Sequence, residues 1–482
     1  MTGRLVAWKW PESEPASPDY SLRVNGEPVF VHQARVRVPI WKREGLWSHH
    51  FPTPDGPRTA FAVFDFDGPV EVAIRPARPF TSARFSPIRH APREHSVKDG
   101  EIRFVWDAPA PLTLLLDDDD DRPLHLFASA PEVRVPGPGD PGVLYFGPGE
   151  HRVTGLELKD GQTLYLAGGA VVRAFPAPDA KKEYSEKFKI DFYHGSVIRA
   201  ADASGIRISG RGILDTSGIP HPGLPTVSLE RCRDAGVEGI VLRDAANWNI
   251  TLLDCDRVLV ENMRIVSGRL NSDGINACHC RDVAVRNCFV RNHDDSFVVK
   301  SLDPNAECRD ILYENCVAWN DWGYAFGVTY ETRGPIRDIR FENCDVLSAR
   351  FFYLGVRACD RGPVERVRFR GVNVENMALH RRAFAGDALY DPQPGFANVA
   401  VAQEIWSDGS GQAGEVNGVE FDGIHLSGDV SVPASALAGY DDGHRVRNVG
   451  FRNITLNGRP VESLSEMGVR VGEFVDGITF GP

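Results

Sequence analysis

The chain has 482 residues, of which 42% are hydrophobic and 25% charged, and its formal net charge at pH 7 is −12. These fractions are ordinary for a folded globular protein, whereas the negative charge argues against general binding to nucleic acid or to anionic membranes. No apolar run reaches the roughly 20 residues that a membrane-spanning helix needs, and the stretch Met1–Tyr20 lacks the apolar core of a secretory signal. We therefore expect a soluble protein that is cytoplasmic, or secreted if a signal peptide has been removed.

Residues 1–135 are predicted to form an antiparallel β-sandwich domain. Short alternating runs such as 59–66 (TAFAVFDF) recur there, and turn-forming pairs such as Asn25-Gly26 separate them. Short strands with such turns are typical of this architecture. The acidic run Asp117–Asp121 either binds calcium or forms a solvated hairpin loop that blocks pairing at a sheet edge.

The chain changes character after a Pro- and Gly-rich junction at 128–142. From 143 to 482 it consists of many short strands separated by Gly, Asn and Asp turns, with almost no helical periodicity. Asn-Cys pairs recur at one constant interval, at Cys288, Cys316 and Cys344. A repeating unit of about 20 to 30 residues built from strands and turns predicts a parallel β-helix.

All nine cysteines lie between Cys232 and Cys359. Their odd number and their clustering predict reduced thiols that stack in the core rather than a disulfide framework. Cys232, Cys255 and Cys278, which follow one another at equal intervals, are expected to form one such stack. Because the Cys-x-Cys at 278–280 has no second pair at ligand spacing, we expect no zinc site.

Two segments interrupt the repeat. Lys181–Gly195 is polar and is predicted to hold a short helix or a mobile loop. Ala378–Gly414 is far longer than a turn requires, and such insertions are commonly functional. Its aromatic residues either form a lid over a sugar-binding groove or pack on the flank of the helix. These residues are Phe384, Tyr390, Phe396 and Trp406.

Three aspartates in the stretch Asn271–Ser301 form the candidate catalytic site. Asp273 and Asp294 are separated by about the length of one repeating unit, and Asp295 follows directly. Residues one coil apart in a β-helix lie roughly 4.8 Å from one another, so two carboxylates would meet on one wall, and a bend in the strand end would bring in the third. Close carboxylates do not ionise together easily, which leaves a protonated acid beside an ionised base, as glycosidic bond cleavage requires. Each aspartate alone could equally be a turn residue.

The order NSDG at 271–274 and HDDSFVVKS at 293–301 resembles the polygalacturonase-type hydrolases of glycoside hydrolase family 28. These share Asn-Thr-Asp-Gly, an Asp-Asp pair and, in bacterial members, Ile-Lys-Ser. Dextranase and isopullulanase relatives of family 49 show the Asn-Ser-Asp-Gly and Asp-Asp motifs and carry an N-terminal β-sandwich. The resemblance covers about 143 to 375. It implies a right-handed, pectin-lyase-like parallel β-helix at 143–482 that carries the catalytic site and acts on carbohydrate without a metal or cofactor.

Carried over residue by residue, the resemblance implies an inverting hydrolysis. Asp294 would protonate the leaving oxygen, while Asp273 and Asp295 would hold and deprotonate the attacking water, with the carboxylates roughly 6.5 to 9.5 Å apart. Asn271 would orient Asp273, and Lys300 matches the lysine of the family. The choice of acid among the three stays open, because coupled carboxylates titrate as a unit.

The chain departs from the polygalacturonase pattern at two motifs. Tyr324 stands where the family has the histidine of Gly-His-Gly, and it could donate a hydrogen bond to a sugar hydroxyl. Gly355 and Arg357 stand at the arginine and lysine of Arg-Ile-Lys, whose two cations grip the galacturonate carboxylate. Losing half of that grip would cost about 1.5 to 3 kcal/mol. We therefore expect a neutral rather than a pectic poly- or oligosaccharide.

Several further residues have two interpretations each. Trp319 and Trp322 either offer a stacking face to a sugar or pack at a coil corner. His293 either tunes the pKa values of the aspartates at the substrate site or is a solvated turn residue. Three arginines either line the groove or are surface cations. They are Arg269, Arg333 and Arg350.

Other functions on the same fold also fit the sequence. In a polysaccharide lyase or epimerase the acids would bind calcium, and Lys300 or Arg357 would abstract the proton α to a uronate carboxylate. A transglycosylase would differ only in the attacking nucleophile. A solenoid can also bind carbohydrate without catalysis. Each alternative has a carbohydrate partner, and the oligomeric state is left open.

Overall fold

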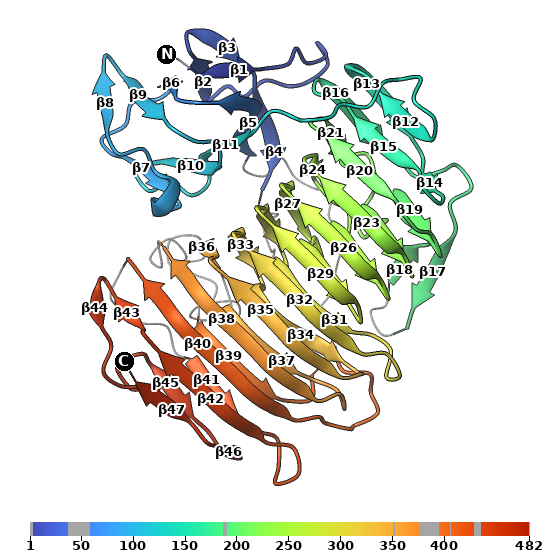
Figure 1. The fold of residues 1–482 in the computed structure, drawn as a ribbon, viewed down its shortest axis with the longest axis vertical. Helices are drawn as coiled ribbons and strands as arrows, with labels where there is room; N and C mark the ends of the chain where they lie inside the picture. Colours follow the sequence, from blue (N-terminus) through green and yellow to red (C-terminus); the bar gives the residue numbers. More distant parts are fainter. Residues whose placement is uncertain are drawn as a thin grey trace.

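The computed structural model describes residues 3–36, 58–186, 190–349, 352–375, 395–404, 406–428 and 435–481. These ranges are built from strands, and their only helical segment is the 3-10 turn η1 (Ile88–His90), so no described helix could cross a bilayer. Figure 1 shows a small N-terminal part, drawn in blue, seated on one side of a long stack of parallel strands that runs from green to red. The predicted right-handed parallel β-helix with an N-terminal antiparallel part is confirmed.

The N-terminal part consists of two sheets. The first has the order β1-β5-β11-β10-β7, with β4 on β5, and the second has the order β3-β2-β6-β9-β8. Pairing is antiparallel except between β5 and β11. The strands of the first sheet are β1 (Arg4–Val6), β4 (Val31–Arg35), β5 (Arg58–Asp67), β7 (Ala83–Ser86), β10 (Pro111–Leu116) and β11 (Leu124–Ser129). Those of the second are β2 (Tyr20–Val24), β3 (Glu27–Val29), β6 (Val70–Pro76), β8 (His95–Lys98) and β9 (Glu101–Trp106).

The burial of these strands follows from their sequences. In β6 buried apolar residues alternate with exposed or half-buried ones, as in a strand with one solvent face. In β5 every residue between the two ends is buried, as its unbroken apolar run requires. Its other face packs on the β-helix, where Phe61 and Val63 contact a cluster that includes Phe289. The N-terminal part is therefore joined to the helix by an apolar interface.

The β-helix has three faces. Faces 1 and 2 belong to one 23-stranded sheet, and face 3 is an 11-stranded sheet. Face 1 comprises β12 (Val143–Phe146), β15 (Thr163–Leu166), β20 (Arg207–Gly210), β23 (Arg233–Glu238), β26 (Asp256–Glu261), β29 (Arg281–Arg286), β32 (Cys308–Glu314), β35 (Ile336–Glu342), β38 (Val364–Val374), β40 (Val416–Leu426), β42 (Val446–Arg452), β46 (Val475–Asp476) and β47 (Thr479–Gly481).

Face 2 comprises β13 (Gly149–Val153), β16 (Ala170–Ala174), β21 (Ile213–Asp215), β24 (Val241–Arg243), β27 (Arg264–Leu270), β30 (Phe289–His293), β33 (Val317–Trp322) and β36 (Asp345–Ser348), and it continues through β38 and β40 to β43 (Thr455–Leu456) and β44 (Arg459–Pro460). Face 3 comprises β14 (Leu156–Leu158), β19 (Ile198–Ala201), β22 (Val227–Glu230), β25 (Ile250–Leu253), β28 (Ile275–Cys278), β31 (Phe297–Ser301), β34 (Tyr324–Thr332), β37 (Phe352–Ala358), β39 (Gly395–Val401), β41 (Ser435–Ala438) and β45 (Val469–Val471).

The Asn-Cys repeat marks one corner of the coils. Asn287, Asn315 and Asn343 each have a positive φ of 54–56°, which asparagine tolerates better than most residues. The cysteines that follow point into the core, and all nine cysteines are buried and free. One stack differs from the prediction, because the register places Cys280, not Cys278, beside Cys255. Cys278 lies on face 3 beside Lys300.

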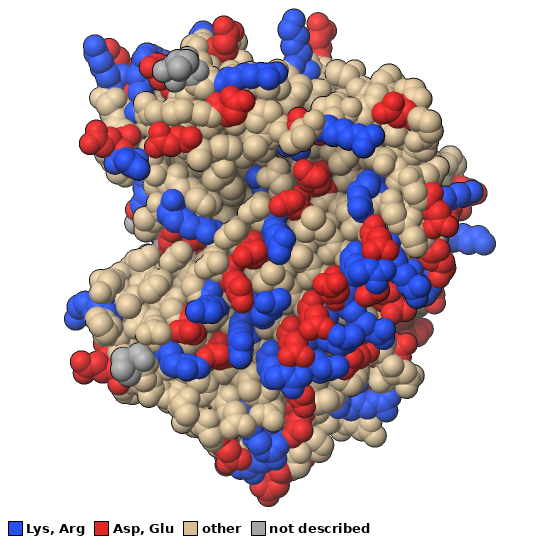
Figure 2. All heavy atoms as spheres, in the orientation of Figure 1, with Lys and Arg blue, Asp and Glu red and all other residues tan. Residues whose placement is uncertain are grey.

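Outside the core, the surface charges are largely paired. Figure 2 shows rows of alternating basic and acidic side chains across the helix. Arg257 pairs with Asp234, for example, and Arg366 pairs with Asp338. Exposed pairs of this kind contribute little to stability. The segment 181–195 is neither a helix nor a simple loop, because β17 (Lys182–Ser185) and β18 (Ile190–Tyr193) form an antiparallel hairpin.

Candidate active site

The candidate site lies at the edge of face 3, where four residues of successive coils occupy equivalent positions. The backbone hydrogen bonds of the ladder continue through these residues, which lie just before the strands or, for the last of them, at the first residue of the strand. They are Trp248, Asp273, Asp295 and Tyr324. Successive coils are about 4.8 Å apart, so Asp273 and Asp295 lie side by side with an aromatic residue beyond each.

Asp294 joins the two because the chain bends between β30 and β31, at Asp294 and Ser296. One carboxylate oxygen of each of the three aspartates lies within 4.8 Å of the others. Gly323, with φ +101°, makes room for this cluster, since a Cβ there would lie 2.7 Å from the Asp295 nitrogen.

Asp295 is held on both carboxylate oxygens. Its Oδ1 accepts a hydrogen bond from the Tyr324 amide at 2.9 Å, and its Oδ2 accepts one from Thr329 Oγ1 at 2.8 Å. Asn276 Nδ2 donates to Asp273 Oδ2 at 3.1 Å, a part expected of Asn271. The backbone of Asn271 instead forms a hydrogen bond with Asp294. Asp273 and Asp295 are 2% and 1% exposed, so both carboxylates are fixed before any substrate arrives.

Lys300 supplies a buried positive charge beside the aspartates. Its Nζ lies 2.9 Å from Glu331 Oε2, 3.5 Å from Asp295 Oδ2 and 3.9 Å from Asp273 Oδ2. Burial by itself would lower the pKa of this ammonium, but the carboxylates outweigh it and hold the pKa well above its usual value. Lys300 is therefore a permanent cation here.

Burial and mutual repulsion act on the three acids together. Burial raises the pKa of Asp294 to about 7, and the neighbouring Asp295 charge adds to the effect. Burial also raises the pKa of Asp273 well above its ordinary value, and Asp294 adds to this. The cluster can thus hold a proton near neutral pH, as a general acid must.

Tyr324 is packed rather than open to a ligand. It is 2% exposed, its ring stacks on Phe352 at 5.3 Å, and it meets Tyr330 edge-on at 5.8 Å. A Cβ at Gly355 would lie 2.3 Å from Tyr324 Cε1. The ring therefore occupies the space that a side chain at position 355 would need. The tyrosine at 324 and the glycine at 355, both departures from the polygalacturonase pattern, are thus structurally linked.

Arg357, the cation that remains at the second motif, already has a counter-ion. Its Nε donates to Glu404 Oε1 at 2.6 Å, its Nη2 donates to the same oxygen, and its Nη1 lies 3.5 Å from Asn398 Oδ1. Burial alone would lower the pKa of the guanidinium, but Tyr324 and Glu404 raise it overall. Nothing in the sequence points to Glu404, because it lies inside the long insertion Ala378–Gly414.

Half-buried aromatic residues surround Lys300. Its Nζ lies 5.4 Å from the Trp248 ring centre and 5.7 Å from that of Tyr330. The ring centre of Tyr330 in turn lies 6.1 Å from that of Trp406. Trp248 was missed from the sequence, although its place one coil before Asp273 was a usable signal. Such rings offer apolar faces with polar edges, which suits sugar rings.

Two residues near the aspartates are buried, which rules out the exposed interpretation of each and leaves the pKa-tuning role of His293 a prediction. His293 is buried, not solvated, and its ring lies parallel to that of Trp322 at 6.0 Å. Arg269 is 2% exposed and donates to backbone carbonyls, among them that of Ala245 at 3.0 Å. It neither lines a groove nor lies on the surface, and it braces the coil corner.

The other candidates divide as follows. Trp319 is fully buried at the interface with the N-terminal part, where the Arg291 guanidinium lies 4.4 Å from its ring centre. Trp322 is half-buried on β33. Arg333 is half-buried, and its Nη1 donates to the Leu302 carbonyl at 3.0 Å. Arg350 lies outside the described residues.

The insertion at 378–414 is described only in part. Phe384 and Tyr390 lie outside the described residues. Phe396 is buried in the helix core against Phe421 and Phe451, so it packs and is not part of a lid. Trp406 reaches the site through its contact with Tyr330.

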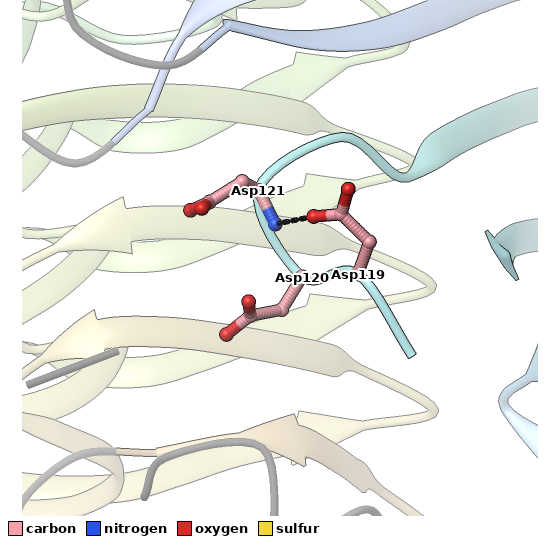
Figure 3. Close-up of side chains that lie close together, drawn as sticks. All are labelled: Asp119, Asp120 and Asp121. Atoms are coloured by element: carbon pink, nitrogen blue, oxygen red, sulfur yellow. Dashed lines mark hydrogen bonds between the residues drawn. The ribbon is translucent and has the colours of Figure 1, made fainter. Parts of the chain in front are cut away.

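A second acidic cluster lies in the N-terminal part. In Figure 3, Asp119 turns back to accept a hydrogen bond from the Asp121 amide, at 3.0 Å. Asp119 also pairs with Arg78 at 2.8 Å, and Arg291 of the helix donates to the Asp120 carbonyl at 2.9 Å. These are the contacts of a hairpin turn that is docked on the helix.

A wide crevice lies elsewhere in the described part of the chain. A hollow of about 1590 Å³ separates the N-terminal part from face 1 and is lined by residues such as Pro131, Arg211 and Arg257. None of the three aspartates lines it. We therefore locate the site by its chemistry rather than by cavity size.

Comparisons with known proteins agree with this picture. The sequence model of glycosyl hydrolases family 28 matches residues 154–380, which confirms the resemblance and supports a glycoside hydrolase. No curated protein matches the chain. Among solved structures, Dex49A from Penicillium minioluteum is similar over 100% of both chains, with a TM-score of 0.67 and 12% identity. The polygalacturonase from Erwinia carotovora ssp. carotovora covers 72% of this chain and 89% of its own, with a TM-score of 0.51 and 13% identity. At these identities the structural likenesses show the fold alone.

Proposed function

We propose that the protein is an inverting glycoside hydrolase that cleaves a neutral poly- or oligosaccharide. The observation that carries the proposal is the cluster of Asp273, Asp294 and Asp295, in which one acid keeps a proton near neutral pH. Asp294, the least buried of the three, donates that proton to the leaving oxygen. Asp273 and Asp295 hold the attacking water.

Retention is a second mechanism that a pair of neighbouring carboxylates can support. Carboxyl groups about 5 to 5.5 Å apart are typical of retaining enzymes, in which one carboxylate attacks the sugar. The nearest oxygens here lie within 4.8 Å. Against retention, both oxygens of Asp295 already accept hydrogen bonds, and Asp273 is almost fully buried. Such carboxylates are better suited to holding a water than to attacking a carbon.

The charges around the acids support a neutral substrate. Glu331 and Glu404 add two carboxylates to the three aspartates, whereas Lys300 and Arg357 are the cations that face them. Each cation is already paired with a carboxylate of the chain. A uronate would bring a further negative charge into a site with an excess of them, which costs free energy in a poorly solvated place.

The same contacts argue against the lyase or epimerase alternative. A catalytic base must lose its proton, but the carboxylates around Lys300 raise its pKa well above the usual value. The Lys300 ammonium also lies 3.5 Å from Asp295 and 3.9 Å from Asp273, where calcium would be repelled.

Two further parts are assigned on the same basis. Trp248 and Tyr330 form the walls against which sugar rings pack. Residues 143–482 form the catalytic domain, and residues 1–135 form an accessory domain that supports the back of the site through Arg291.

The test is incubation of the protein with neutral and acidic glycans, including dextran, pullulan, arabinan, fructans and polygalacturonate, followed by proton NMR of fresh products. We expect a neutral glycan to release sugar with inverted anomeric configuration. Retained configuration would establish the second mechanism. An unsaturated, ultraviolet-absorbing product that a chelator abolishes would establish a lyase.

A further inference from the structure

The ion pair between Arg357 and Glu404 is partly buried and is held by several hydrogen bonds. Arg357 projects from β37 and Glu404 follows β39, the next strand of face 3, and the two side chains are 24% and 25% exposed. Glu404 Oε1 accepts hydrogen bonds from both Nε and Nη2 of Arg357. Glu404 therefore occupies the Nε–Nη2 edge of the guanidinium, and only the edge formed by its two Nη atoms remains for a ligand.

The segment around Glu404 is itself anchored. The Glu404 amide donates to Ser407 Oγ at 2.9 Å, and that hydroxyl donates to the Cys359 carbonyl at 2.7 Å. The Asp408 amide donates to Asp360 Oδ1 at 2.7 Å. These hydrogen bonds fix the backbone of Glu404 to the coil that carries Arg357. The two side chains are therefore held next to each other in the folded protein.

The pair also belongs to the surroundings of the catalytic acids. Arg357 is the register partner of Thr329 on the neighbouring strand β34, and Thr329 Oγ1 donates to Asp295 Oδ2 at 2.8 Å. Tyr324, whose amide binds Asp295, interacts electrostatically with both Arg357 and Glu404. A sugar next to the one that is cleaved would meet this ion pair.

We propose that Glu404 is a specificity-determining residue, which occupies Arg357 so that the site accepts a sugar hydroxyl and rejects a sugar carboxylate. The inference rests on the proposed function and adds to it the residue that sets the charge of the substrate. The pair presents a donor edge and an acceptor oxygen together, which suits neutral hydroxyls. Without Glu404, the same guanidinium would bind a carboxylate through two parallel hydrogen bonds.

The test uses a charged and a neutral form of one sugar, trigalacturonate and its methyl ester, with affinities measured by titration calorimetry at pH 7. Glu404→Gln should bind the free acid about tenfold more tightly than the native protein does, as one charge-assisted contact allows. Binding of the ester should change by less than about twofold, since it has no charge to gain from.

Two further variants show where a gain comes from. Adding Arg357→Met to Glu404→Gln should remove the gain. Glu314→Gln, which deletes the carboxylate of another Glu–Arg pair of the helix, should behave like the native protein. An unchanged ratio of acid to ester affinity in folded Glu404→Gln would overturn the inference, as would a gain that survives the loss of Arg357.

A measurement on the native protein covers the case in which the variant does not fold. Added salt should improve binding of the free acid relative to the ester, because it screens the repulsion from the carboxylates of the site. If salt instead weakens binding of the acid, Arg357 is available to it and the inference is wrong. Neither readout depends on turnover, so failure to cleave any neutral glycan would refute the proposed function separately.

Discussion

Asp294→Asn separates a catalytic acid from an ordinary buried aspartate, because it should lower activity and raise stability together. An asparagine has nearly the same shape and keeps an oxygen for the Asp295 amide, which now donates to Asp294 Oδ1 at 2.9 Å. It can neither donate the proton of a carboxylic acid nor become charged. General acid catalysis is worth about 10²- to 10⁴-fold, so we expect kcat to fall by about that factor.

The effect on stability follows from the pKa of Asp294, which burial raises from 3.8 to about 7. The protonated form stabilises the fold fully below about pH 4, and this contribution is lost as the pH rises through 7. At 1.36 kcal/mol per pKa unit the loss is at most about 4 kcal/mol. Partial exposure and sharing of the proton with the neighbouring acids reduce it, so we expect about 1 to 3 kcal/mol at pH 8.

The assay is urea unfolding of the native protein and of Asp294→Asn at pH 4 and pH 8, beside steady-state hydrolysis of the glycan that the panel identifies. The variant should match the native protein at pH 4 and exceed it at pH 8. Asp282→Asn, at an exposed position of β29, should change neither property. Full activity in Asp294→Asn, or equal stability at pH 8, would refute the reasoning.

Four further results are expected. The rate should fall as the pH rises past about 7, because burial holds the pKa of Asp294 there; a rate that still increases at pH 9 would contradict this. Lys300→Met should lower the free energy of unfolding by about 3 to 5 kcal/mol at pH 7 in urea titrations, because it leaves buried carboxylates unpaired; most of the loss should be recovered at pH 4, where they are protonated. Trp248→Ala should raise KM by about tenfold with a smaller change in kcat, as loss of a stacking face does, and Trp248→Phe should restore much of it. Gly355→Arg should abolish native stability in thermal melts, since its Cβ would lie 2.3 Å from the Tyr324 ring, and Tyr324→Ala in the same chain should relieve part of the loss.

The sequence predicted those site residues that lie within one coil of each other or next to each other in the chain. Asp273 and Asp295 lie one coil of face 3 apart, and Asp294 needs only the bend beside it. The coils of this face differ in length, however. The register pairs Phe297 with Phe326 but Leu354 with Ala397, which is a much longer step along the chain. Glu404 could not be matched to Arg357 by any fixed spacing, because Glu404 lies within the insertion Ala378–Gly414.

The sequence also did not predict which residues are buried at the interface between the N-terminal part and the helix. Trp319 looked like a possible sugar platform, yet the N-terminal part covers it. His125 and Arg291, which are far apart in the sequence, meet in that interface at 3.2 Å. Such a contact depends on how two separately patterned surfaces fit, and no periodicity within either part encodes it.

The sequence by itself therefore determined the repeat, the three acidic residues and the absence of an arginine at position 355. These depend on backbone preferences and on spacing within one coil, which act over short stretches of the chain. Only the tertiary structure decided that Tyr324 fills the space above Gly355 and that Arg357 is paired with Glu404. Both depend on which side chains of different coils come into contact. Because inserted loops change the number of residues between coils, the sequence spacing does not reveal these contacts.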